Sequence, residues 1–300
     1  MERALPIHTI IAALSLDPDS NPVAERAFQL AAQHNARLIL VHVIETAAHT
    51  ASMTTSDSPS PLLTLRQEAQ YHIQQKIDEK LRQNAVDIVI REGAPYAIIR
   101  ELQDREQADL LIIGPGKAQT VREHLFGSTA DRLVRLSSCP VLIVRNENSR
   151  PYERISVAID FSALSAAAFH AAAELGEGAA IDLVHIVDIP LSFEQAALKA
   201  GTPHNEIASY RQAKADSARK QVEDFLADKQ PNAPPIQVRI FHGSPANSLV
   251  TLSAKPNTDL LALGLQGQNI ITRALIGSVA QRVLQAAACD ILTVGAEALN

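Results

Sequence analysis

The chain has 300 residues, of which 46% are hydrophobic and 20% are charged, and its formal net charge is −6. This length and apolar content predict a globular protein of two domains rather than a disordered chain. The acidic balance, together with only 4% aromatic residues and no tryptophan, disfavours nucleic-acid binding, which needs a basic surface and stacking side chains.

The two cysteines, Cys139 and Cys289, are too few for a disulfide framework and are typical of a reducing compartment. Each precedes the last predicted strand of its half, where small apolar side chains pack, so both are predicted to be buried structural thiols. No apolar run approaches the ~20 residues needed to span a bilayer, and the short run 10–14 is not followed by a small-residue cleavage site. We therefore expect a soluble cytoplasmic protein with no membrane partner.

In chain order, apolar strand-like runs alternate with segments of helical periodicity. In the first half the predicted strands are 8–16, 37–44, 86–91, 110–113 and 141–145, and the predicted helices are 22–34, 64–84, 95–106 and 128–137. Thr64 to Gln67 has the form of a capping box that starts the second of these helices. The second half has predicted strands 155–159, 181–187, 236–241, 260–263 and 291–294, with helices after each of the first four.

An internal repeat relates the two halves. Positions that recur 150 residues further on (264 − 114, for example) are Gly93 and Gly243, Asp109 and Asp259, Gly114 and Gly264, Gly127 and Gly277, and Cys139 and Cys289. One constant offset over some fifty residues indicates a tandem duplication. Strands that alternate with helices predict the α/β class, here two tandem doubly wound domains, 1–149 and 150–300, each with a five-stranded parallel sheet. The polar, proline-containing stretch 146–151 is the predicted linker.

A glycine-rich loop in the second half is the strongest functional signal. Gly264 and Gly267 follow a buried strand, and Gly277 and Ser278 lead into a helix. Glycines allow backbone N–H groups to face an anion, and a helix N-terminus attracts one. Ser278 can cap that helix or donate its hydroxyl to a phosphate. This pattern predicts a phosphate cradle.

The spacing glycine, two residues, glycine, nine residues, glycine, serine resembles the ATP-binding signature of the universal stress protein family. The strand that ends at Asp160, the strand with His185, the Gly-x-Pro turns and the Cys-Pro-Val-Leu-Ile-Val segment after Ser138 resemble the same family. The resemblance implies an adenine nucleotide alpha-hydrolase-like, Rossmann-like fold whose two domains pair antiparallel through their last strands. It also implies ATP with Mg²⁺, a protein partner and a possible homodimer of the tandem chain.

Carried over residue by residue, the resemblance assigns the nucleotide to the second domain. The implied binding residues are Ala158, Asp160, Ile186, Gly264, Gly267, Gln268, Gly277, Ser278 and Val279, with Arg273 as a further phosphate contact. The first domain departs from the pattern, because Lys117 stands where the second glycine is expected and Ser15 where the aspartate is expected. A weaker first-domain site is implied at Val43, Gly114, Lys117, Gly127 and Ser128.

Other kinds of site fit the residues less well. The segment 114–117 is not a P-loop, because the upstream glycine is replaced by Leu111 and Ala118 follows the lysine. His42 and His185 occupy matching strand ends, where a structural hydrogen bond is favoured over a proton shuttle. No cluster has metal-ligand spacing.

We therefore expect a cytoplasmic stress-response protein that binds ATP through its C-terminal domain and acts as a nucleotide-dependent sensor or signalling module. No positioned general base is visible, so an enzyme is not predicted, although slow ATP hydrolysis is left open. Two alternatives stay open. One is an ATP-independent interaction protein with vestigial sites, and the other is a small-ligand binder that uses residues 52–61 as a lid.

Overall fold

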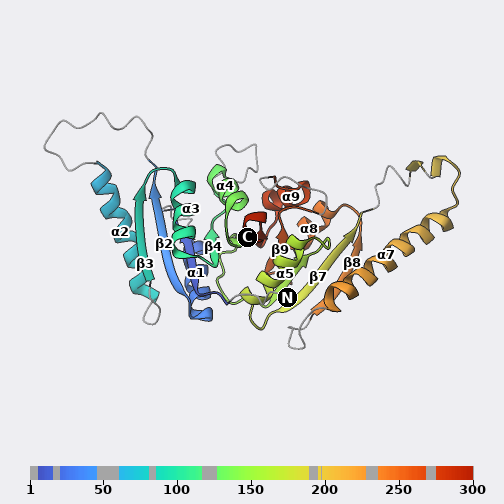
Figure 1. The fold of residues 1–300 in the computed structure, drawn as a ribbon, viewed down its shortest axis with the longest axis horizontal. Helices are drawn as coiled ribbons and strands as arrows, with labels where there is room; N and C mark the ends of the chain where they lie inside the picture. The colour runs from blue at the N-terminus through green and yellow to red at the C-terminus, as the bar shows by residue number, and fades with distance from the viewer. Residues whose placement is uncertain are drawn as a thin grey trace. The chain divides into compact units, whose positions relative to one another are not determined.

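The computed structural model describes residues 6–15, 21–45, 61–80, 86–116, 127–188, 195–196, 198–227, 236–267 and 275–299. The chain divides into two compact units: unit 1 comprises residues 1–151 and 297–300, and unit 2 comprises residues 152–296. Each unit alternates strands and helices (Figure 1).

Unit 1 contains a parallel sheet in the order β3-β2-β1-β4-β5. Its strands are β1 (Thr9–Ala13), β2 (Arg37–Ile44), β3 (Val86–Glu92), β4 (Leu110–Ile113) and β5 (Val141–Ile143). Its helices are α1 (Asn21–His34), α2 (Pro61–Lys80), α3 (Pro95–Glu106) and α4 (Ser128–Leu136). All side chains of β4 and β5 are buried, which is typical of parallel strands covered on both faces.

Unit 2 repeats this arrangement in the order β10-β9-β6-β7-β8. Its strands are β6 (Arg154–Ala158), β7 (Ala180–Val187), β8 (Ile236–His242), β9 (Leu260–Gly264) and β10 (Asp290–Val294). Its helices are α5 (Ala163–Leu175), α7 (His204–Ala227), α8 (Pro245–Ser253) and α9 (Ser278–Ala286). The 3-10 turn η3 (Ala296–Leu299) falls mostly in the C-terminal residues that are assigned to unit 1. The predicted α/β class and the five parallel strands per half are confirmed.

Helices cover the sheets through apolar faces at helical spacing. In α4, Ala130, Leu133 and Val134 are buried, and Ala280, Val283 and Leu284 repeat this pattern in α9. The longest helices are α2 and α7, which pack beside the outer strands of their own units (Figure 1). Among the described residues, no helix is both long and apolar enough to cross a membrane.

Predicted boundaries differ from the observed ones at several elements, among them α2, β1 and β5. Helix α2 already begins at Pro61, so Thr64 does not start it, and proline is favoured in the first turn because its missing N–H has no partner there. Strand β1 ends at Ala13, because the carbonyl of the next residue, Leu14, is used by His42 instead of a neighbouring strand. Strand β5 ends at Ile143 rather than residue 145.

The strand order determines where a ligand site can form. In unit 1 the order reverses at β1, so that β2 lies on one side of it and β4 on the other, and β6 has the same position in unit 2. Connections on the two sides of such a switch point run in opposite directions and leave a crevice at the carboxyl ends of the strands. The residues that directly follow β1 and β4 lie at the crevice of unit 1, and those that directly follow β6 and β9 lie at the crevice of unit 2.

Candidate functional site

Asp160 lies two residues after the end of β6, at the switch point of unit 2. Its Oδ1 accepts a hydrogen bond from the backbone N–H of Ser162 at 3.0 Å. Ser162 is the N-cap of α5, and its Oγ accepts the N–H of Ser165 at 3.1 Å. The carboxylate is therefore held at a helix N-terminus, which stabilises negative charge.

The first two signature glycines pack against this loop. A Cβ at Gly267 would lie 2.9 Å from Oδ2 of Asp160. A Cβ at Gly264 would lie 2.8 Å from Cβ of Leu164, in the first turn of α5. At Gly264 a Cβ would also lie 2.9 Å from the backbone carbonyl carbon of Leu164, so glycine allows the close approach of two backbones there. At Gly267 the close atom belongs to a side chain, so a Cβ would displace the Asp160 carboxylate. The loop after β9 is thus brought against the aspartate that the sequence placed in the same site.

The third signature glycine closes the loop. Gly277 donates its N–H to the carbonyl of Leu265 at 2.8 Å, and Gln266 Nε2 donates to the carbonyl of Leu275 at 2.7 Å. Gly277, rather than Ser278, is the N-cap of α9. The expected capping role of Ser278 was wrong, because the helix begins at Ser278 and the preceding residue occupies the cap. The N–H groups in the first turn after Gly277 have no acceptor within the helix and can face an anion.

An aromatic cluster borders the site, which the sequence analysis missed. Phe161 has a left-handed backbone with φ of +63°, an uncommon conformation for a bulky residue that typically marks a functional or constrained position. Its ring lies 4.7 Å from that of His185, centroid to centroid, and 6.4 Å from that of Phe225. Position 161 directly follows the aspartate, which is the signal that could have identified it.

The matched histidines have the predicted structural role. His185 Nδ1 lies 2.9 Å from the carbonyl of Ile159, and His42 Nδ1 lies 2.9 Å from the carbonyl of Leu14. A carbonyl only accepts, so the ring N–H donates in both units. Each histidine contacts the residue just after the first strand of its own unit, Leu14 or Ile159. These two residues therefore occupy equivalent positions in the two repeats. Ser15 therefore occupies in unit 1 the position of Asp160 in unit 2.

The other predicted residues of unit 2 lie on neighbouring elements. Ala158 ends β6, Ile186 is a buried residue of β7, and Val279 lies in the first turn of α9. Gln268 and Arg273 lie outside the described residues. Of the predicted residues, Asp160 and Gly267 lie close to each other, and Gly264 lies close to the first turn of α5.

The corresponding loop of unit 1 has a different backbone. Gly116 has φ of +78°, and a Cβ there would lie 2.9 Å from Cα of Gly127. Gly127 donates its N–H to the carbonyl of Pro115 at 3.2 Å, as Gly277 does to Leu265. Residues 115 and 116 thus lie against Gly127, the N-cap of α4. Lys117 lies outside the described residues.

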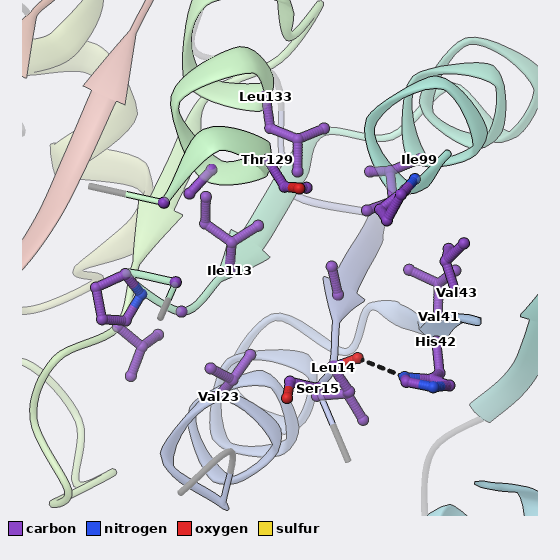
Figure 2. Close-up of a pocket in the computed structure, with 18 of the residues that line it drawn as sticks. Leu14, Ser15, Val23, Val41, His42, Val43, Ile99, Ile113, Thr129 and Leu133 are labelled. Carbon is purple, nitrogen blue, oxygen red and sulfur yellow. Dashed lines mark hydrogen bonds between the residues drawn. The ribbon is translucent and has the colours of Figure 1, made fainter. Parts of the chain in front are cut away.

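Unit 1 nevertheless contains a cavity of about 820 Å³ at its switch point (Figure 2). The predicted weaker-site residues Val43, Gly114, Gly127 and Ser128 all line it. The wall also includes charged side chains that the sequence analysis missed, Glu45, Arg145 and Glu147. Glu45 and Arg145 follow the second and last strands, and carboxyl ends of parallel strands converge at one edge of a sheet, so their positions could have indicated this.

Metal and thiol chemistry are not indicated. In the described ranges, no group of three or more His, Cys, Asp or Glu side chains could hold a metal ion. Cys139 and Cys289 are both buried, as predicted, and neither forms a disulfide. Burial raises the pKa of the Cys139 thiol to about 11, although hydrogen bonds from Ser137 and Gln103 oppose the shift. Such a thiol is uncharged near neutral pH and unreactive.

Comparison with known proteins identifies the family. The profile described as "Universal stress protein family" matches residues 6–145 and again residues 151–295. The chain belongs to the universal stress protein family. Two successive matches make it a tandem member.

Individual relatives agree with this assignment. A universal stress protein of Mycolicibacterium smegmatis is 23% identical over 301 residues, which cover 95% of this chain and 96% of that protein. Universal stress protein A homolog 2 of Coxiella burnetii is 28% identical over 142 residues, 47% of this chain and 96% of that one. The crystal structure of a universal stress protein from Archaeoglobus fulgidus has the same fold, with a TM-score of 0.65 at 16% identity, covering 96% of this chain and 98% of that one.

Proposed function

We propose that this tandem universal stress protein binds ATP through unit 2 and acts as a nucleotide-dependent sensor or signalling module in a stress response. The observation that supports this most directly is the contact between the two parts of the signature. Gly267 of the glycine loop lies so close to Asp160 that a Cβ there would be 2.9 Å from Oδ2 and would displace the carboxylate.

The chemistry of these groups suits a nucleotide. The Asp160 carboxylate can accept a charge-assisted hydrogen bond from a ribose hydroxyl. The phosphates would be held by backbone N–H groups of the glycine loop and by Ser278 and Val279 at the start of α9, where the helix dipole favours negative charge. Mg²⁺ would accompany ATP through phosphate oxygens and water and would neutralise part of its charge.

Unit 1 is proposed to bind ATP weakly or not at all. Ser15 offers a neutral hydroxyl where unit 2 has a carboxylate, so the charge-assisted bond to ribose is lost. The described backbone also differs locally, because Gly116 has φ of +78° and packs against Gly127.

The alternative is an ATP-independent interaction protein in which both sites are vestigial. It requires that the glycines at 264 and 267 serve only close packing, which the contacts with Leu164 and Asp160 also satisfy. Nucleotide dependence of partner binding separates the two proposals. Neither proposal includes catalysis.

The test is a calorimetric titration of Mg-ATP into the nucleotide-free chain. Asp160→Ala removes the carboxylate, and Ser15→Ala is the matched variant in unit 1. We expect one ATP per chain, lost in Asp160→Ala and retained in Ser15→Ala. Two ATP molecules per chain would contradict the asymmetry between the units, and no binding to the wild-type chain would favour the ATP-independent alternative. Circular dichroism confirms that each variant is folded.

A further inference from the structure

The cavity of unit 1 has a mainly aliphatic wall. Val23 of α1, Ile99 of α3, Ile113 of β4 and Leu133 of α4 surround a common space (Figure 2). Each of these side chains is at most 5% exposed, so they belong to the hydrophobic core and still border the cavity. A volume of about 820 Å³ lies within the range of small-molecule sites, which are mostly apolar with a few polar groups.

The described polar groups of the wall do not match a polyphosphate. Among the described residues, the ionisable side chains of the wall apart from His42 are the carboxylates of Glu45 and Glu147 and the guanidinium of Arg145, which together carry a net charge of −1 (two negative, one positive). A negative wall repels a ligand with several negative charges. Ser15 supplies no carboxylate for a ribose, and Gly116, with φ of +78°, packs against Gly127.

A few neutral polar groups are placed to orient a ligand. The hydroxyls of Ser15 and Thr129 and the ring of His42 line the cavity together with the aliphatic side chains. Nδ1 of His42 donates to the carbonyl of Leu14, which leaves Nε2 as the ring nitrogen available to a ligand. A wall of this composition favours a molecule with a large apolar surface and one or two hydrogen-bonding groups.

We infer that the unit 1 cavity is a second ligand site, which takes an uncharged, mainly apolar small molecule and is separate from the nucleotide site of unit 2. Burial of apolar ligand surface against these side chains supplies the affinity. This inference goes beyond the proposed function and does not depend on it, because its residues all belong to unit 1. The two units of the duplicated chain would then sense two different classes of ligand.

The test uses Nile red, an uncharged apolar dye whose fluorescence rises on burial, with the full-length chain. Val43→Trp fills the cavity from the end of β2. Thr129→Glu places a carboxylate in the wall while remaining favourable in the first turn of α4. Ala97→Glu is the control, because Ala97 is exposed on α3 and does not line the cavity.

We expect saturable binding of about one dye per chain, unchanged in Ala97→Glu and unaffected by saturating Mg-ATP. Both cavity variants should weaken binding at least about tenfold, the effect of a 1.4 kcal/mol loss. If Val43→Trp does not fold, Thr129→Glu decides the question. Absence of saturable binding, equal binding by folded cavity variants, or displacement of the dye by ATP would each overturn the inference. None of these dye measurements depends on whether unit 2 binds ATP.

Discussion

Asp160 and Gly267 approach so closely that a Cβ on the glycine would lie 2.9 Å from Oδ2 of the aspartate. The carboxylate is held from the other side by the N–H of Ser162, 3.0 Å from Oδ1. One oxygen is thus fixed by the start of α5, and the other lies against the glycine loop. This contact joins the ends of β6 and β9 across the switch point of unit 2.

Gly267→Ala is expected to weaken ATP binding without unfolding the chain. The new methyl group must displace the Asp160 carboxylate, a side-chain group that can rotate, so the effect falls mainly on the site. A loss of about 1.5–3 kcal/mol, the worth of a hydrogen bond to a charged group, corresponds to a tenfold or greater rise in Kd. Calorimetric titration with Mg-ATP measures it, and an unchanged Kd would remove Asp160 from the proposed site.

Gly264→Ala and Gly114→Ala form a matched pair for stability. At Gly264 a Cβ would meet both Cβ and the backbone carbonyl carbon of Leu164, at 2.8 and 2.9 Å, whereas at Gly114 the nearest atom is Cγ2 of Val23 at an ordinary 3.5 Å. Overpacking against backbone costs about 1–3 kcal/mol, so Gly264→Ala should lower the free energy of unfolding by that amount. Gly114→Ala should change it by less than about 0.5 kcal/mol. Urea denaturation without nucleotide compares them, and equal effects would contradict the close approach at β9.

Tyr152→Phe should destabilise unit 2, because it removes the hydrogen-bond donor to the buried side chain of Asp290. The Tyr152 hydroxyl donates to Oδ2 of Asp290 at 2.7 Å, and Asp290 is fully buried. Loss of a buried partner costs about 1–3 kcal/mol because desolvation of the acceptor is no longer offset. Tyr96→Phe is the control, since the ring of Tyr96 lies under the Arg132 guanidinium and Phe preserves that contact. Thermal and urea unfolding should separate the two variants clearly, and similar midpoints would contradict this role of the hydroxyl.

The Cys139 thiol should resist labelling in the folded chain. Its pKa is raised by burial from 9.0 to about 11, so in a Cys289→Ala background a disulfide reagent at pH 8 should react only after denaturant is added. The native state holds this proton more tightly than the unfolded state does. The stability that this supplies is therefore complete below pH 9 and is lost as the pH rises towards 11. A further Cys139→Ala change should flatten that decline, and rapid labelling of the native chain would contradict the burial.

Much of this architecture could be predicted from the sequence. The 150-residue repeat, the alternation of strands and helices, and the glycine spacing are local patterns, and each reflects a requirement of one strand, helix or turn. The structural role of His42 and His185 and the burial of both cysteines also followed from position. Element ends were less predictable: β1 stops at Ala13 because the carbonyl of Leu14 binds a side chain from β2.

The tertiary structure decided what the repeat leaves open. Two pairs of residues occupy equivalent places in the repeat, Ser15 with Asp160 and Gly116 with Gln266. Only the packing shows that Gly116 lies against Gly127, and that Gly267 lies against Asp160. The cavity of unit 1 likewise depends on how α1, α3 and α4 meet the sheet. The sequence by itself determined the family, the duplication and the candidate residues, because these depend on local pattern. Shape and contact between distant segments depend on side-chain packing across the sheet, which no local pattern specifies.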